Sequence, residues 1–108
     1  MEKLKYNQQY AMEGKHRRFL KTLANPTRFS LIMALRDGPK NVTELEQAVG
    51  REQSTVSNNL QRLRDCGFVA VEKEGQHRIY RLNDETIEPL LGLIDEHTEQ
   101  YCRHCMED

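Results

Sequence analysis

Two short helical patterns separated by a three-residue break are the feature that most constrains the fold of this chain. Residues 43–49 form a short amphipathic pattern that Gly50 closes, and a second helical pattern runs over residues 53–66 and ends at Gly67. Glycine is favoured at such ends because it adopts the left-handed backbone conformation without strain. Two short helices joined by a tight glycine-containing turn predict a helix-turn-helix at residues 43–66.

The segment that follows alternates apolar and polar residues in two short runs. Residues 68–73 and 77–82 flank a loop that contains Gly75. A period of two on both sides of such a loop predicts a β-hairpin over residues 68–82, which would be the wing of a winged helix-turn-helix. We expect the apolar positions of the hairpin to be Val69, Val71 and Ile79, with Tyr80 on the other face.

Three further helices complete the predicted order. A loosely periodic helix is expected over residues 3–23, and Asn25 followed by Pro26 is a typical start for a second helix over residues 27–36. A last helix is expected from about residue 85 to residue 103, with a start nearer Thr86 because Pro89 falls early in it. The second helix is predicted to be largely buried through its apolar residues Phe29, Leu31, Ile32, Met33 and Leu35.

This order, α-α-α-α-β-β-α, predicts a mainly α fold with a small β-hairpin in one domain of 108 residues. Apolar residues make up only 37% of the chain, so we expect part of its apolar surface to be buried between two copies. The net charge of −1 argues against a general basic coat for nucleic acid but leaves room for a local basic surface.

Several functional classes are disfavoured by what the sequence lacks. It has no run of 18 apolar residues and no apolar signal core near Met1, which predicts a cytoplasmic protein without a membrane partner. It has no glycine-rich phosphate loop and no nucleophile motif, which argues against an enzyme.

Residues 53–64 of the second helical pattern have one face suited to reading DNA. With Val56, Leu60 and Leu63 turned inward, the opposite face of this stretch carries hydroxyls, amides and one guanidinium, and it has no carboxylate. Such groups match the donors and acceptors of base edges in the major groove, whereas carboxylates are repelled by phosphate. The residues predicted to read bases are Gln53, Ser54, Ser57, Asn58 and Gln61, and those predicted to contact phosphate are Lys40, Arg51, Thr55, Arg62, Lys73, Gln76, His77 and Arg78.

Two other interpretations of this face stay open. A polar helix face is often only solvated, and some winged helices are protein-docking modules that do not bind DNA. A docking helix would more typically expose Leu, Phe or Met, and residues 53–62 present none of these on the outward face.

Three segments carry a family resemblance: residues 23–28 (LANPTR), residues 44–50 (ELEQAVG) and residues 53–69 (QSTVSNNLQRLRDCGFV). Together they resemble the ArsR/SmtB family of prokaryotic repressors, and the similarity extends over roughly residues 17–95. The resemblance implies a homodimer paired through its first and last helices, here residues 1–24 and 84–105. It also implies binding to an operator with two-fold symmetry and release by an inducer, which in some members is a metal or metalloid ion.

The inducer sites that the resemblance implies are incomplete in this chain. The family's Cys-x-Cys site would fall in residues 42–46, which contain no cysteine. The family's zinc site on the last helix would fall at Asp84, Thr86, His97 and Gln100, where two of the four ligand types remain. Neutral oxygen ligands are poor for zinc, so we do not expect that site to be intact.

The C-terminal tail offers a different candidate metal site. Thiolates and imidazoles are good ligands for Zn, Cd, Cu(I) or arsenite, and the candidate ligands are His97, Cys102, His104 and Cys105. Reversible oxidation of Cys102 and Cys105, or the absence of any inducer, are the alternatives. Cys66, beside the helix-ending Gly67, is expected to be a small packing residue.

Overall fold

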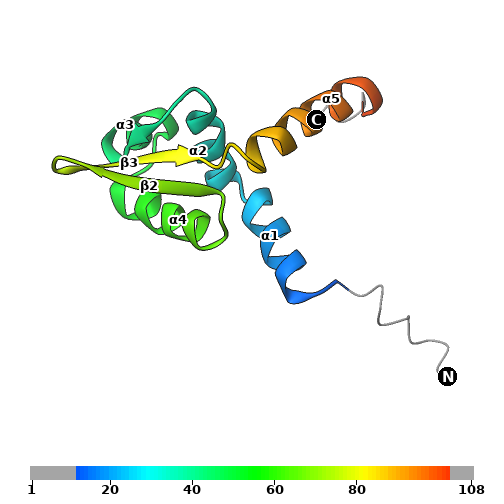
Figure 1. Cartoon of the computed structure of the whole chain (residues 1–108), viewed down its shortest axis with the longest axis horizontal. Helices are drawn as coiled ribbons and strands as arrows, with labels where there is room; N and C mark the ends of the chain where they lie inside the picture. The colour runs from blue at the N-terminus through cyan, green and yellow to red at the C-terminus, as the bar shows by residue number, and fades with distance from the viewer. Residues whose placement is uncertain (1–11, 103–108) are drawn as a thin grey trace.

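The computed structural model describes residues 12–102 and confirms the predicted order of elements, with one additional strand. Figure 1 shows the helices and the long hairpin, which belongs to a three-stranded sheet. In chain order the elements are α1 (Gly14–Ala24), α2 (Pro26–Arg36), β1 (Lys40–Asn41), α3 (Val42–Val49), α4 (Gln53–Asp65), β2 (Val69–Glu74), β3 (His77–Leu82) and α5 (Ile87–Tyr101).

The first and last helices are shorter than the sequence predicted. Met12 and Glu13 precede α1 outside any helix, and Glu13 has an extended backbone (φ −79°, ψ 161°). The predicted helix over residues 3–23 is therefore wrong at residues 12 and 13, and its part before residue 12 lies outside the described residues. The last helix begins at Ile87, because the side chain of Asn83 accepts the backbone N–H groups of Glu85 and Thr86 in a turn.

Side-chain caps explain where α2 and α3 begin. The Asn25 side chain accepts the backbone N–H of Arg28 at 3.0 Å, which satisfies one of the free donors at the start of α2. At α3, Asn41 and Glu44 form a capping box in which each side chain accepts the other residue's backbone N–H at 2.8 Å. These local hydrogen bonds set the direction of each helix as it enters the core.

The sheet corrects the predicted facing of the hairpin. Its strand order is β1-β3-β2, and the antiparallel register places Val69 opposite Leu82 and Val71 opposite Tyr80. Tyr80 and Leu82 consequently join Val69 and Val71 on the core side, whereas Ile79 lies on the other face. Strand β1 was not predicted because two residues are too short to show an alternating pattern.

The core lies between α2, α3, α4 and one face of the sheet. Its most deeply buried large side chains come from the three helices and from the residue just before β2: Leu31, Ile32, Leu45, Val56, Leu60, Leu63 and Phe68. The expectation that α2 is buried through all five of its large apolar residues is only partly right. Phe29 and Met33 are 36% and 38% exposed, because they lie on the side of α2 that turns away from the core.

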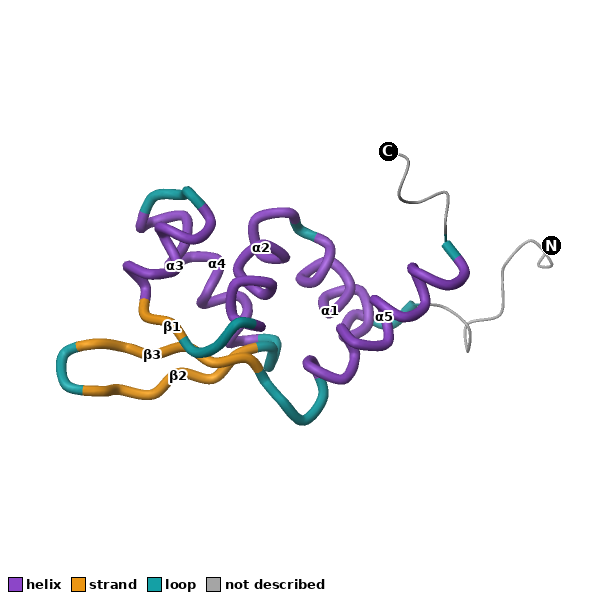
Figure 2. Tube along the Cα trace, turned by 90° about the horizontal axis from the view of Figure 1, so that it is seen from above, coloured by secondary structure: helices purple, strands orange, loops and turns teal. Residues whose placement is uncertain are grey.

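Helices α1 and α5 both project from one end of the molecule, opposite the hairpin tip (Figures 1 and 2). In α1 only Thr22 is buried, and α5 buries Ile87 and Leu91 near its start. Farther out, Leu20, Leu93 and Tyr101 are between 48% and 70% exposed. Across the described residues, no helix combines the length and apolar character needed to span a bilayer.

Candidate nucleic-acid interface

The outward face of α4 is held in solvent by an apolar seam on its inner side. Val56, Leu60 and Leu63 have no exposed surface, which confirms the predicted inward positions. Because a helix turns 100° per residue, burying these three directs the opposite side chains outward. The exposed residues of that face are Gln53, Ser54, Ser57, Asn58 and Gln61, and Thr55 beside them is half-buried.

The first turn of α4 is suited to an anion. Its N-cap residue, Glu52, has an extended backbone and makes no side-chain cap, and the first turn contains no acidic residue. Free N–H groups at a helix start carry a partial positive charge and donate to phosphate oxygens. The start of α4 can therefore take a phosphate while the exposed amides and hydroxyls face base edges.

The hairpin places four predicted contact residues around its tip. Lys73, Gln76, His77 and Arg78 are all exposed, and the register sets Lys73 directly opposite Arg78. Two like charges in such a cross-strand pair repel one another, so a phosphate beside them would relieve the repulsion. Three of these residues (Gln76, His77 and Arg78) line a cleft of about 240 Å³ together with the start of α3.

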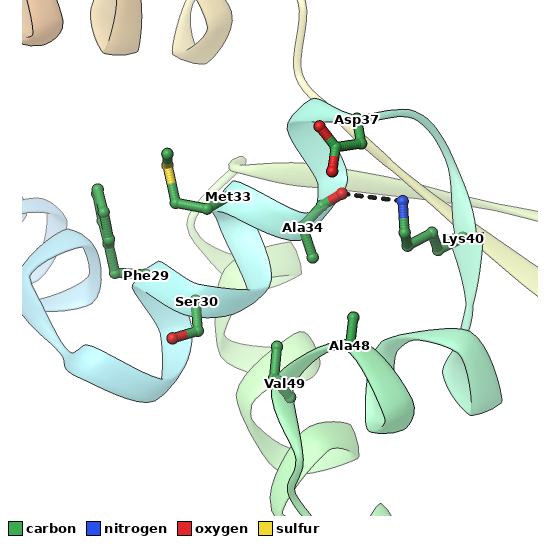
Figure 3. Close-up of a pocket in the computed structure, with 8 residues that line it drawn as sticks. All are labelled: Phe29, Ser30, Met33, Ala34, Asp37, Lys40, Ala48 and Val49. Carbon is green, nitrogen blue, oxygen red and sulfur yellow. Dashed lines mark hydrogen bonds between the residues drawn. The ribbon is translucent and has the colours of Figure 1, made fainter.

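Two predicted phosphate contacts point elsewhere in the structure. The Nε of Arg62 donates to the hydroxyl of Thr22 on α1 at 3.2 Å, so this half-buried side chain lies on the flank of α4 and not on its outward face. The ammonium of Lys40 donates to the carbonyl of Ala34 at 3.0 Å near the end of α2 (Figure 3), where a cation stabilises the negative end of the helix. Arg51 remains exposed in the turn between α3 and α4.

Residues that the sequence analysis did not single out connect α4 to the first two helices. Arg28 donates from Nε to the carbonyl of Thr22 at 3.0 Å and from one terminal nitrogen to Oδ1 of Asn59 at 3.1 Å. Its other terminal nitrogen donates to the carbonyl of Lys21 at 3.1 Å. No local pattern marks Asn59 or Thr22, since their partners lie 31 and 40 residues away.

Cys66 lies at the edge of these contacts. Its sulfur is 3.3 Å from the hydroxyl oxygen of Thr22. Burial by itself raises the pKa of the Cys66 thiol, but hydrogen bonding with Thr22, Arg18 and Arg62 outweighs that effect and leaves the pKa lowered. The thiol is half-buried, so its expected packing role is joined by a polar contact to α1.

The C-terminal candidate ligands are only partly within the described chain. His97 is exposed on α5, with its ring 5.2 Å from the ring of Tyr101, and Cys102 is the C-cap of that helix. His104 and Cys105 lie outside the described residues. Within residues 12–102, no group of three or more His, Cys, Asp and Glu side chains is placed to hold a metal ion.

A shallow groove of about 480 Å³ runs between α2 and α3. Figure 3 shows Val49 and Ala48 of α3 on one side of this groove, with Phe29 and Met33 projecting from α2. These two exposed side chains extend the apolar surface that α1 and α5 present at the same end of the molecule.

Known proteins share both the sequence and this arrangement. Residues 25–71 match the model of the bacterial regulatory proteins of the arsR family. The chain is 40% identical over 80 residues to the HTH-type transcriptional regulator NmtR of Mycobacterium tuberculosis, covering 74% of this chain and 67% of that protein. It is 33% identical over 76 residues to a probable mercury resistance operon repressor of Streptomyces lividans, covering 70% of this chain and 61% of that protein.

A solved structure extends the likeness to the whole fold. The homodimeric winged helix-turn-helix DNA-binding domain of a possible ArsR-family regulator from Mycobacterium bovis superimposes with a TM-score of 0.76 at 30% identity. The superposition covers 83% of each chain. Shared sequence, element order and helix-turn-helix geometry lead to one conclusion: this chain belongs to the ArsR family of winged helix-turn-helix transcriptional regulators.

Proposed function

We propose that this protein is a homodimeric repressor that binds an operator with two-fold symmetry. The observation that carries the proposal is the outward face of α4, where five exposed hydroxyl and amide side chains lie over a fully buried apolar seam. Side chains of this kind recognise base edges through paired donors and acceptors. The exposed wing residues and the uncapped start of α4 supply the phosphate contacts that position such a helix.

The distribution of exposed apolar side chains favours DNA over a protein as the partner of α4. In the described part of the chain, large exposed apolar residues lie on α1, α2 and α5 and at Met12, and none lies on α4 or on the wing. A protein-docking helix would place such residues at the centre of its contact face. The exposed residues of this face from Gln53 to Gln61 instead offer uncharged hydroxyls and amides, and the Gln61 amide also donates to the exposed Asp65 carboxylate one turn later at 3.0 Å.

The apolar surface at the opposite end supports the dimer. Leu20 on α1, Phe29 and Met33 on α2, and Leu93 and Tyr101 on α5 leave apolar area in water that a second copy would cover. A two-fold axis at this end would pair α1 and α5 of the two copies and direct the two α4 helices into successive major grooves about 34 Å apart. Because the operator is genomic DNA, the protein would act in the cytoplasm.

The proposal is tested by selecting duplexes of about 30 base pairs from a random library with the wild-type protein. We expect an inverted repeat to be enriched. The logarithm of the association constant for this duplex should fall linearly with the logarithm of the salt concentration, because binding releases counterions from the DNA. Asn58→Ala combined with Gln61→Ala should weaken that binding at least about tenfold, since each good base contact contributes 1–3 kcal/mol.

The matched control is Gln100→Ala, which removes an exposed amide from α5, far from the reading face. This variant should bind the selected duplex like the wild type. Unchanged binding by the Asn58/Gln61 variant would show that α4 does not read the operator in this way. A slope of zero in the salt titration would also overturn the proposal.

Cys102 is disulfide-bonded in this structure. For the inducer, we propose that the Cys102 and Cys105 pair, once reduced to thiols, senses a thiophilic metal or metalloid ion together with His97 and His104. Support comes from the ligand chemistry and from the mercury resistance repressor among the relatives. Elemental analysis of reduced protein after incubation with Zn, Cd or arsenite should find bound ion, and Cys102→Ser with Cys105→Ser should abolish it. Bound ion retained by the double variant would refute this assignment, and release of operator by peroxide alone would favour thiol oxidation.

A further inference from the structure

We infer that Thr22, Arg28 and Asn59 are positioning residues that set the angle of the recognition helix α4 against the dimerisation helix α1. With Arg62 and Cys66 they form what we call the three-helix junction. The inference rests on the proposed operator-binding dimer and adds a new element to it: a fixed spacing between the two recognition helices. None of the three residues needs to touch DNA for this role.

The junction joins three helices through side-chain hydrogen bonds. Arg28 on α2 donates to the carbonyls of Thr22 and Lys21 in the last turn of α1 and to Oδ1 of Asn59 on α4. Asn59 is itself oriented by donating to the carbonyl of Thr55 at 2.8 Å. Each of the three nitrogens of the Arg28 guanidinium thus donates a hydrogen bond, so this planar group bridges α1 and α4.

A second connection passes through Thr22, whose side chain is completely buried. Its hydroxyl donates to the carbonyl of Arg18 at 2.7 Å, one turn earlier in α1, and accepts from Nε of Arg62 on α4 at 3.2 Å. The hydroxyl can therefore form the link to Arg62 only in its present orientation. Removing it would leave the donor of Arg62 without this acceptor.

The charges at the junction show that its geometry is held against repulsion. Burial lowers the pKa of Arg28, and the positive charge of Arg62 lowers it further. Among the ion pairs formed between described residues, none joins either arginine to a carboxylate. Neutral oxygens accept hydrogen bonds from both guanidinium groups instead, and the nearby Cys66 sulfur offsets part of the repulsion because it raises the pKa of Arg28.

The junction lies away from the start of α4, so a change in its geometry displaces the side chains that would read DNA. Asn59 lies at the middle of this 13-residue helix and Arg62 in its C-terminal half, while Gln53, Ser54 and Ser57 lie nearer its start. At a rise of about 1.5 Å per residue, the start of α4 is about 9–14 Å from these two residues, so a tilt of about 10° there moves it by roughly 2 Å. That displacement is more than half of the rise of one base pair, about 3.4 Å.

In a dimer, a tilt of α4 at the junction changes the position of both recognition helices relative to the two half-sites. Each α1 is fixed to its partner at the two-fold axis, so the angle between α1 and α4 determines how far apart the two reading faces lie. Once one α4 has bound its half-site, a fixed angle holds the second α4 close to the other half-site. A variable angle lowers the effective concentration of the second α4 at that half-site. The junction therefore affects binding to a complete operator and leaves binding to one half-site unchanged.

The test compares Thr22→Val with Thr22→Ser on three duplexes. The duplexes are the operator selected by the wild-type protein, the same sequence with one base pair inserted at its centre, and a duplex with one half-site. Valine keeps the shape of threonine but lacks the hydroxyl, and serine keeps the hydroxyl. Sedimentation and thermal unfolding establish that each variant is a folded dimer.

We expect Thr22→Val to bind the complete operator about tenfold more weakly, to bind the half-site within about twofold of wild type, and to lose less affinity from the inserted base pair. Thr22→Ser should behave like the wild type. The inference would be overturned if Thr22→Val lost equal affinity for the complete operator and for the half-site. It would also be overturned if the inserted base pair weakened binding by Thr22→Val as much as it weakens binding by the wild type. A general loss of structure predicts both results.

Asn59→Ala provides an independent variant if Thr22→Val does not fold. It removes the α4 acceptor of Arg28. This variant should also lose affinity for the complete operator while it binds the half-site like the wild type. A loss on the half-site as well would mean that Asn59 contacts DNA directly and would overturn its positioning role. A wild-type protein that enriches no sequence would overturn the proposed function itself, before any variant is compared.

Discussion

The helix-turn-helix body and the two terminal helices contain similar apolar side chains but bury them very differently. In α2, α3, α4 and the sheet, most of the large apolar residues have less than a tenth of their surface exposed. In contrast, Leu20 of α1 and Leu93 and Tyr101 of α5 are about half exposed or more. Apart from Phe29 and Met33, the body buries most of its large apolar side chains within one chain, whereas the terminal helices present a surface that a second chain would cover.

This difference separates the two tasks of the molecule. The body must hold α4 rigidly, because DNA reading depends on side chains placed to within fractions of an ångström. In the proposed dimer, the terminal helices would hold the two bodies together and would need to move relative to one another when an inducer binds. Variants in the two regions should therefore fail in different ways.

The largest effect is expected from Leu60→Ala in the body. Leu60 has no exposed surface and belongs to the seam of α4, so truncation leaves a cavity in the core. The free energy of unfolding should fall by about 3 kcal/mol, as measured by chemical denaturation. If the free energy of unfolding falls by less than about 1 kcal/mol, the core around Leu60 is less tightly packed than its burial indicates.

The next effect concerns the terminal helices, where Leu93→Glu should separate the dimer. Leu93 is 63% exposed in one chain, and a carboxylate buried between two copies would be strongly unfavourable. The dissociation constant of the dimer should rise about a hundredfold by analytical ultracentrifugation. The conservative control Leu93→Met should remain dimeric. If Leu93→Glu stays dimeric at wild-type affinity, α5 is not part of the contact surface.

A smaller loss is expected at the capping box of α3. Asn41→Ala removes the acceptor for the Glu44 N–H and disturbs the return hydrogen bond. Unfolding free energy should fall by about 1 kcal/mol while the dimer is unaffected. Asn41→Ser, which restores a capping oxygen, should recover most of the loss. A changed dimer affinity would show that the body and the terminal helices are coupled more closely than their burial suggests.

The smallest effect is expected at the ion pair between the two regions. Arg36 of α2 contacts Asp95 of α5 at 2.9 Å, but the Asp95 side chain is 59% exposed. Asp95→Asn should change the free energy of unfolding by less than about 1 kcal/mol, and the remaining difference should vanish at high salt. A loss above that value would indicate that this pair orients α5 against the body.

The local features of the fold were predictable from short stretches of sequence. The helix-turn-helix followed from two apolar periodicities closed by glycines, and Gly50 and Gly67 do adopt positive φ angles of 67° and 76°. The buried seam of Val56, Leu60 and Leu63 followed from spacing alone. Such features are decided within one or two helical turns, so residues close in sequence contain the information.

Features that depend on how distant segments meet were not predictable in the same way. Phe29 and Met33 read as core residues because every position of α2 except its ends is apolar or small, and only the packed fold shows which side faces α3 and α4. Arg62 was expected on the reading face, since it lies within the polar segment of α4. Its position beside Thr22 depends on where α1 docks, which no pattern within α4 reveals.

The sequence by itself determined which segments are helices, where they stop, and which face of α4 is polar, because hydrophobic spacing and backbone preferences act over a few residues. Only the tertiary structure decided which side chains connect α4 to α1 and α2, because those contacts join residues 31 and 40 positions apart. Their energies depend on orientation and distance after the core has packed. The chemistry of the reading face is thus local, whereas its placement in space belongs to the whole fold.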